Sequence, residues 1–153
     1  MSRGITKIEI LIVILLAVII IAGDVFVWIY LDKKAHDVNI LSDINQIRSS
    51  LDVYLTINNY YPKISEAVLL NDDYSSTQKL CAEGFKRIND KCAMVIQDPL
   101  PNSYLSEGNN YMYKSDGENY QIQFYLSTNF SQFNLVKGVN CATNSTITST
   151  PCF

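Results

Sequence analysis

Hydrophobic and polar positions divide the chain into two parts of different character. From Ile5 to Leu31, 22 of the 27 residues are apolar, and the only charged residues are Lys7, Glu9 and Asp24. From Asp32 onward, 50 of 122 residues are apolar and polar residues are interspersed among them. The pattern predicts an apolar N-terminal segment followed by a small polar domain.

The apolar segment has the length of one membrane span. The 24 residues from Ile8 to Leu31 would form a helix of about 36 Å, and a bilayer core of about 30 Å needs around 20 residues. Trp28 and Tyr30 stand near its end, where aromatic side chains meet the membrane interface. The run is too long for a secretory signal peptide, and Ala22–Asp24 is a poor cleavage site. We therefore expect a retained membrane helix, for which a plain anchor is the simplest role.

The helix is expected to continue beyond the span, because no proline occurs before Pro62. Apolar residues recur at helical spacing after the span: Val38, Leu41, Ile44, Ile47 (or Arg48), Leu51, and Tyr54 with Leu55. The opposite face is expected to hold polar residues, including Asp37, Asp43 and Asp52. Asn58-Asn59 favours a left-handed cap, so we predict one helix from about Ile5 to Asn58.

The remainder, residues 60–153, is expected to form a small head. Tyr111–Tyr113 and Tyr120–Leu126 alternate as strands around Ser115-Asp116-Gly117, a strong hairpin signal. Residues 134–139 are expected to add a short strand. Residues 70–96 are expected to form a variable connecting region, and residues 142–151 a loop. The predicted fold class is α+β, with the long helix packed on one small antiparallel sheet.

Four cysteines follow the apolar segment, at Cys81, Cys92, Cys141 and Cys152. Their even number in a small domain indicates two disulfides and an oxidising compartment, and no C-x-x-C pair suggests a metal or redox site. Three connectivities are possible; the local one, 81–92 with 141–152, is the simplest. Four reduced, buried cysteines are the alternative.

Composition argues against most enzymes. The net charge is −3 without a basic run, His36 is the only histidine, and neither common nucleotide-binding glycine motif is present. Two acidic pairs are candidate calcium ligands, Asp116 with Glu118 and Asp72 with Asp73, but turns and loops explain them better. We predict no catalytic residue, no metal and no cofactor. The ten tyrosines suit core packing better than stacking on nucleic acid, which remains a possible partner without specific support.

The N-terminus resembles that of type IV prepilins and type II secretion pseudopilins. In that family a short basic leader ends in glycine, and a glutamate stands five residues later within an apolar helix. This chain has Arg3 and Gly4, then Thr6, Ile8 and Glu9, with Ile5 in place of the commoner phenylalanine and Lys7 in place of leucine. The Asn58–Pro62 exit from the helix and the Asp-Gly hairpin are also similar to the family.

The resemblance implies a role for each matching position. Gly4 would be the last residue of a leader, residues 1–4, removed by a prepilin peptidase. Ile5 would become the new N-terminus and be N-methylated. Glu9 would pair with the terminal amine of a neighbouring subunit during assembly, although a carboxylate that reaches the interface of an uncleaved anchor is an alternative.

The implied organisation has four parts: the leader 1–4, a transmembrane and assembly helix 5–31, an amphipathic half 32–59 and a pilin-fold head 60–153. The implied function is that of a structural subunit of a type IV pilus or pilus-like filament, a homo-oligomer handled by an inner-membrane assembly machinery. Before assembly it would be a single-pass membrane protein, N-terminus inside and head outside; after assembly it would be extracellular. The alternative is a minor pilin or anchored binding module that captures DNA or a surface ligand.

Overall fold

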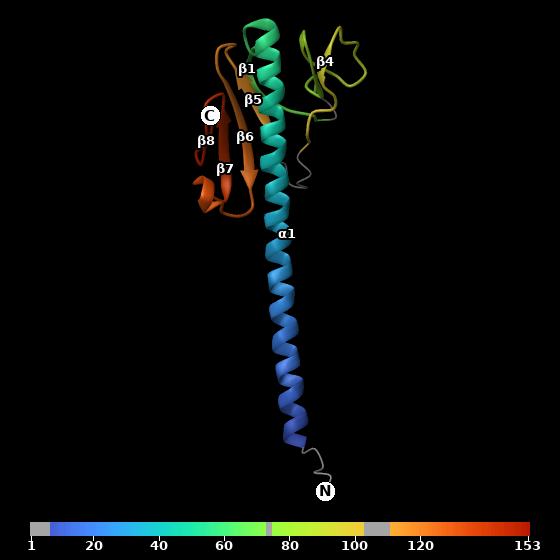
Figure 1. The fold of residues 1–153 in the computed structure, drawn as a ribbon, viewed down its shortest axis with the longest axis vertical. Helices are drawn as coiled ribbons and strands as arrows, with labels where there is room; N and C mark the ends of the chain where they lie inside the picture. The colour runs from blue at the N-terminus through green and yellow to red at the C-terminus, as the bar shows by residue number, and fades with distance from the viewer. Residues whose placement is uncertain (1–6, 73–74, 103–110) are drawn as a thin grey trace. The chain divides into compact units, whose positions relative to one another are not determined.

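The computed structural model describes residues 7–72, 75–102 and 111–153. These residues form a long helix and two antiparallel sheets, an α+β arrangement (Figure 1). The chain divides into two compact units, Met1–His36 and Asp37–Phe153. The helix α1, Lys7–Asn58, contributes residues to both units.

Within the second unit, α1 buries one narrow stripe. Its buried residues are spaced alternately by three and four: Asp37, Ile40, Ile44, Ile47, Leu51 and Tyr54. The predicted stripe is therefore confirmed from Ile44 onward, since this spacing places side chains on one helical face. Before Ile44 the prediction was right for Leu41, which is half-buried against the core, and wrong for Val38, because the stripe continues through Ile40 instead. Val38 is 51% exposed.

The helix ends where the sequence predicts. Asn59 adopts a left-handed conformation with φ of 63°, and its N–H donates to the carbonyl oxygen of Leu55 at 2.7 Å. An asparagine at this position tolerates the positive φ, and the bond satisfies one of the last free carbonyls of the helix. Tyr61 and Pro62, which follow, are buried and turn the chain toward the sheet.

The larger sheet has five strands in the order β1-β5-β6-β7-β8, all paired antiparallel. The strands are β1 Ile64–Leu69, β5 Met112–Ser115, β6 Tyr120–Leu126, β7 Gly138–Thr143 and β8 Ile147–Thr148. The predicted hairpin is confirmed: Ser115 pairs with Tyr120 and Met112 with Gln123. Alternate residues of β6 are buried, as expected for a strand with one face on a core.

Three details of the predicted sheet were wrong. The strand expected at 134–139 begins instead at Gly138 and extends to Thr143, after a short 3₁₀ helix, η1 Ser131–Phe133. The loop expected at 142–151 contains β8. The strand β1 had no sequence signal, because its burial does not alternate and its pairing partner β5 lies more than forty residues later.

A second, three-stranded sheet lies in the region expected to be only a connection. It consists of β2 Lys79–Cys81, β3 Gly84–Lys86 and β4 Val95–Gln97, in the order β3-β2-β4. The buried Lys79 lies in it, with its Nζ 3.6 Å from an Asp98 carboxylate oxygen and 2.9 Å from the carbonyl oxygen of Ile88. Strands of three residues are too short to show a period, so hydrophobic periodicity could not predict this sheet.

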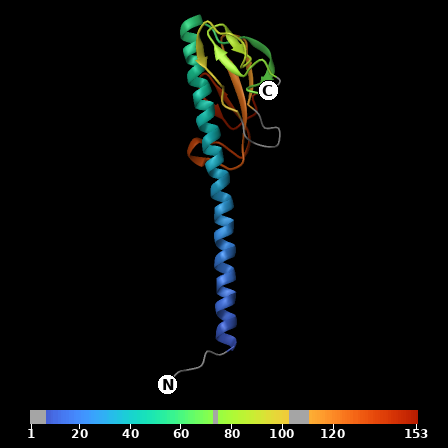
Figure 2. The ribbon, with the colours of Figure 1, turned by 90° about the vertical axis from the view of Figure 1, so that its right-hand side faces the viewer.

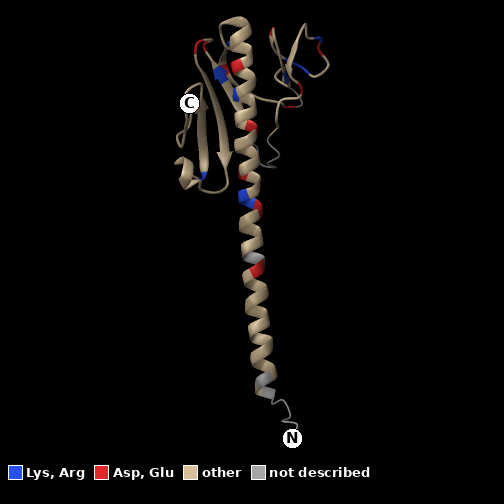
Figure 3. Ribbon diagram, in the orientation of Figure 1, with Lys and Arg blue, Asp and Glu red and all other residues tan. Residues whose placement is uncertain are grey.

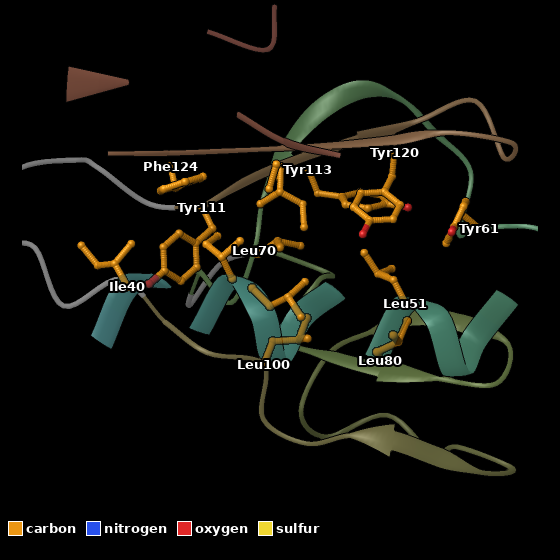
Figure 4. Close-up of a cluster of buried hydrophobic side chains, with 14 of the residues drawn as sticks. Ile40, Leu51, Tyr61, Leu70, Leu80, Leu100, Tyr111, Tyr113, Tyr120 and Phe124 are labelled. Atoms are coloured by element: carbon orange, nitrogen blue, oxygen red, sulfur yellow. The ribbon is translucent and has the colours of Figure 1, made fainter. Parts of the chain in front are cut away.

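Both sheets and the helix share one hydrophobic core (Figure 4). Leu51 of α1, Leu80 of β2 and Tyr113 of β5 are all buried in it. Figure 2 shows the ribbon turned by 90° from the view of Figure 1, with the sheets beside the last part of α1. The core therefore joins the stripe on α1 to side chains from both sheets.

We expect Ile47→Ala to lower the free energy of unfolding of the head by about 2–5 kcal/mol, because Ile47 is fully buried. The matched control is Val53→Ala on the same helix, where 49% of the side chain is exposed and the change should stay within about 0.5 kcal/mol. Guanidinium unfolding of the detergent-held chain, followed by tyrosine near-UV circular dichroism, measures both. Equal effects would contradict the proposed burial of this face.

Candidate functional site

The most unusual surface of the described chain is the apolar part of α1. Between Ile8 and Leu31, seventeen large hydrophobic side chains are each at least 49% exposed within the chain itself. Figure 3 shows this run with few charged residues. Soluble monomers rarely expose contiguous apolar patches larger than a few hundred Å². By length and composition this helix is able to cross a membrane.

The three residues to which the resemblance gives roles lie at the start of the chain. Gly4 and Ile5 lie outside the described residues. Glu9 belongs to α1, but its side chain is also outside what is described. Cleavage, methylation and the pairing of Glu9 therefore stay predictions.

The cysteines form two local pairs. Cys81 on β2 lies with Cys92 in the connection between β3 and β4, with their Cα atoms 5.7 Å apart. Cys141 on β7 lies with Cys152 near the chain end, at a Cα separation of 5.1 Å. Both pairs are at disulfide distance, in the local arrangement among the three that the sequence allows. One pair closes the small sheet and the other holds the last residues on the larger sheet.

Asp37 is the residue whose role the sequence concealed most. It was predicted on the polar face of the helix, and it is instead fully buried. Its Oδ1 accepts the N–H of Ser127 at 2.8 Å, and its Oδ2 accepts the N–H and the hydroxyl of Thr128 at 2.7 and 2.6 Å. A buried carboxylate is tolerated when several donors satisfy its oxygens. Its position in the sequence could have revealed this burial, because Asp37 lies three residues before Ile40 and so continues the buried stripe of the helix.

Tyrosine hydroxyls add further links between the helix and the sheet. Tyr111 donates to Asp43 Oδ2 at 2.8 Å, and Tyr113 donates to the carbonyl oxygen of Pro62 at 2.9 Å. Burial raises the pKa of Tyr113 well above its ordinary value, so this hydroxyl keeps its proton and stays a donor at any physiological pH.

Five of the eight tyrosines in the described ranges are buried in the core: Tyr54, Tyr61, Tyr111, Tyr113 and Tyr120. T-shaped ring pairs among them and their neighbours include Tyr61 with Tyr120 at 4.8 Å and Phe85 with Tyr113 at 5.0 Å. The core-packing interpretation is confirmed for these five. Lysine and arginine are interspersed with acidic residues over the described head (Figure 3), so the charge pattern gives nucleic-acid binding no support.

Acidic residues considered for calcium have other roles where they are described. Within the described ranges, no group of three or more His, Cys, Asp or Glu side chains is placed to hold a metal ion. Asp116 Oδ1 accepts the N–H groups of Asn119 and Glu118 at 2.7 and 2.9 Å, which closes the β5–β6 turn. These bonds hold the pKa of Asp116 below its ordinary value. Asp73 lies outside the described residues.

No protein-family model, no curated protein and no solved structure matches this chain. The features that bear on function are therefore its own: an apolar helix with exposed side chains, and a small head with two cysteine pairs.

We expect Asp37→Asn to destabilise the head by about 2–4 kcal/mol. The amide nitrogen of the variant would lie opposite N–H and O–H donors that a carboxylate oxygen accepts from in the wild-type protein. The matched control is Asp52→Asn, an exposed carboxylate on the same helix, with an expected change within about 0.5 kcal/mol. The measurement is the guanidinium midpoint of the full chain. If both variants unfold at the wild-type midpoint, the three bonds to Asp37 contribute nothing to stability.

Proposed function

We propose that this protein is a structural subunit of a type IV pilus or a related pilus-like filament, polymerised through its N-terminal helix. The observation that carries the proposal is the run of seventeen exposed hydrophobic side chains from Ile8 to Leu31. Such a surface suits lipid before assembly and identical helices afterwards. The Gly4–Glu9 spacing distinguishes this proposal from a plain anchor, which needs neither residue.

The chemistry of Glu9 supports the proposal. A carboxylate inside an apolar stretch costs a few kcal/mol unless an opposite charge is near, so it is a functional candidate by default. Cleavage after Gly4 would create an amine at Ile5, and N-methylation would leave that amine able to carry a positive charge. An amine from a neighbouring copy satisfies Glu9 and sets the axial register between the packed helices.

The head suits export from the cytoplasm. Two cysteine pairs at disulfide distance favour an oxidising compartment. Arg3 and Lys7 before the span balance Lys33 and Lys34 after it, so the positive-inside count does not choose an orientation and the cysteines are the feature that favours one. We propose an inner-membrane precursor with the N-terminus inside and the head outside, and an extracellular filament after assembly.

The proposed partners follow from this life cycle. They are a prepilin peptidase, further copies of the chain and an inner-membrane assembly machinery. The head, with its helix packed on antiparallel sheets, is proposed to be a variant of the pilin fold. The role is structural, with no enzymatic activity of its own.

Processing is tested by mass. We expect the exported protein to begin at Ile5, with the intact mass lowered by that of residues 1–4 and raised by one methyl group. Intact-mass spectrometry with N-terminal fragmentation measures both changes, and Gly4→Leu, which should block the peptidase, is the control. An exported protein that retains Met1–Gly4 would show that the leader is not removed.

Assembly is tested at Glu9. We expect Glu9→Ala to abolish filaments while membrane insertion stays intact, because the variant removes the charge that selects the neighbouring terminus. Ile12→Ala is the control, since it removes apolar contact from the same segment without changing a charge. Membrane fractionation and electron microscopy of sheared filaments give the two readouts. Normal filaments from Glu9→Ala would rule out the assembly role.

A further inference from the structure

A depression in the head surface is not used by any role assigned so far. It lies where the end of α1, the β5–β6 turn and the β7–β8 turn converge, and its volume is about 520 Å³. Its lining combines aromatic, amide and charged side chains: Leu55, Asn59, Tyr60, Tyr61, Lys63, Asp116, Gly117, Glu118 and Asn144. This volume is within the ordinary range for small-ligand sites, about 300–1,000 Å³.

The aromatic part of the lining is held in place from behind. The exposed Tyr60 ring meets Tyr54 edge-on, with ring centroids 5.9 Å apart. Tyr61 packs edge-on against Tyr120 at 4.8 Å. Burial, and then the hydrogen bond with Tyr60, raises the pKa of Tyr54 to about 12, so the Tyr54 ring stays uncharged. The aromatic side chains of the depression are therefore already oriented before a ligand binds.

The polar part is also fixed by hydrogen bonds. Tyr61 N–H donates to the carbonyl oxygen of Gly117 at 2.8 Å, which joins the segment after the helix to the β5–β6 turn. Gly117 has a φ of 101°, a backbone conformation that residues with a side chain rarely adopt. Asn144 Nδ2 donates to Asn119 Oδ1 at 3.2 Å, which joins the second turn to the first. These two bonds join three segments that are distant in the sequence into one rim.

The charges in the rim do not select an ion. Lys63 is the cation, and Asp116 and Glu118 are the carboxylates. All three are exposed, so water screens them, and both signs stand side by side. Together with Asn59 and Asn144, they offer donors and acceptors around a partly aromatic floor.

We propose that this depression binds a neutral carbohydrate, a pyranose residue of a surface glycan. A pyranose has C–H groups on its faces, which suit the Tyr60 ring, and hydroxyl groups around its edge. Each hydroxyl both donates and accepts a hydrogen bond, which matches a rim of amides, carboxylates and an ammonium group. The rim residues lie between positions 55 and 144, so the proposal does not depend on filament assembly through residues 5–31.

The test uses the full chain held in a polyacrylate amphipol, which contains no sugar. The probes are the methyl pyranosides of glucose, galactose, mannose and N-acetylglucosamine, observed by saturation-transfer NMR against amphipol without protein. We expect transfer to at least one of them. Tyr60→Ala should weaken that binding about tenfold through loss of the ring face, and Asn144→Ala about fivefold through loss of hydrogen bonding.

Phe133→Ala is the matched control, because Phe133 is an aromatic residue outside the depression with 62% of its side chain exposed. It should leave binding unchanged. Near-UV circular dichroism checks that each variant is folded, and Asn144→Ala remains decisive if Tyr60→Ala is not. No transfer to any of the four sugars at millimolar concentration would overturn the proposal, as would unchanged binding in both rim variants. Binding of tetramethylammonium or phosphate without any sugar would also overturn it and indicate an ion site.

Discussion

The buried carboxylate of Asp37 constrains how the helix lies on its sheet. A carboxylate away from water is stable only while donors surround it, and here Ser127 and Thr128 supply three. Shifting α1 by one residue would rotate its side chains by about 100°, remove the acceptor from these donors and turn Ile44 away from the core. The position of α1 against the sheet is thus specified by the hydrogen bonds to Asp37 as well as by the apolar stripe.

The same helix meets two different demands along its length. From Asp37 onward, one stripe and its polar contacts define a single rotational position against the two sheets. From Ile8 to Leu31, apolar side chains lie on every face, so hydrophobicity selects an apolar environment without selecting an orientation. A polar group can supply that selection, and Glu9 and Asp24 are the carboxylates in this stretch. In the proposed filament Glu9 would take an intermolecular partner, whereas Asp37 has intramolecular ones.

Elements that form through the conformational preferences of a few neighbouring residues were predicted correctly from the sequence. The hairpin around Asp116-Gly117 and the helix end at Asn58 both follow from conformational preferences of a few residues. Asp37 could not be predicted in the same way, because residue type indicated solvent and its donors lie about ninety residues later. The sheet of β2, β3 and β4 was missed for a similar reason: its short strands depend on pairing and on the shared core. Among the residues that line the depression, only those of the β5–β6 turn and of the helix end had been singled out from the sequence.

Substitutions on the head surface need not affect the apolar helix, because different residues form the two surfaces. In the proposed filament, substitutions in the apolar helix would act on packing between copies. The rim of the depression is made of two turns and a helix end, elements that tolerate change while the core stays intact. Asn59 and Gly117 are exceptions, since their positive φ angles are required by the backbone. The rim therefore separates into backbone positions that build the depression and side chains, such as Tyr60 and Asn144, that are available to determine which ligand it takes.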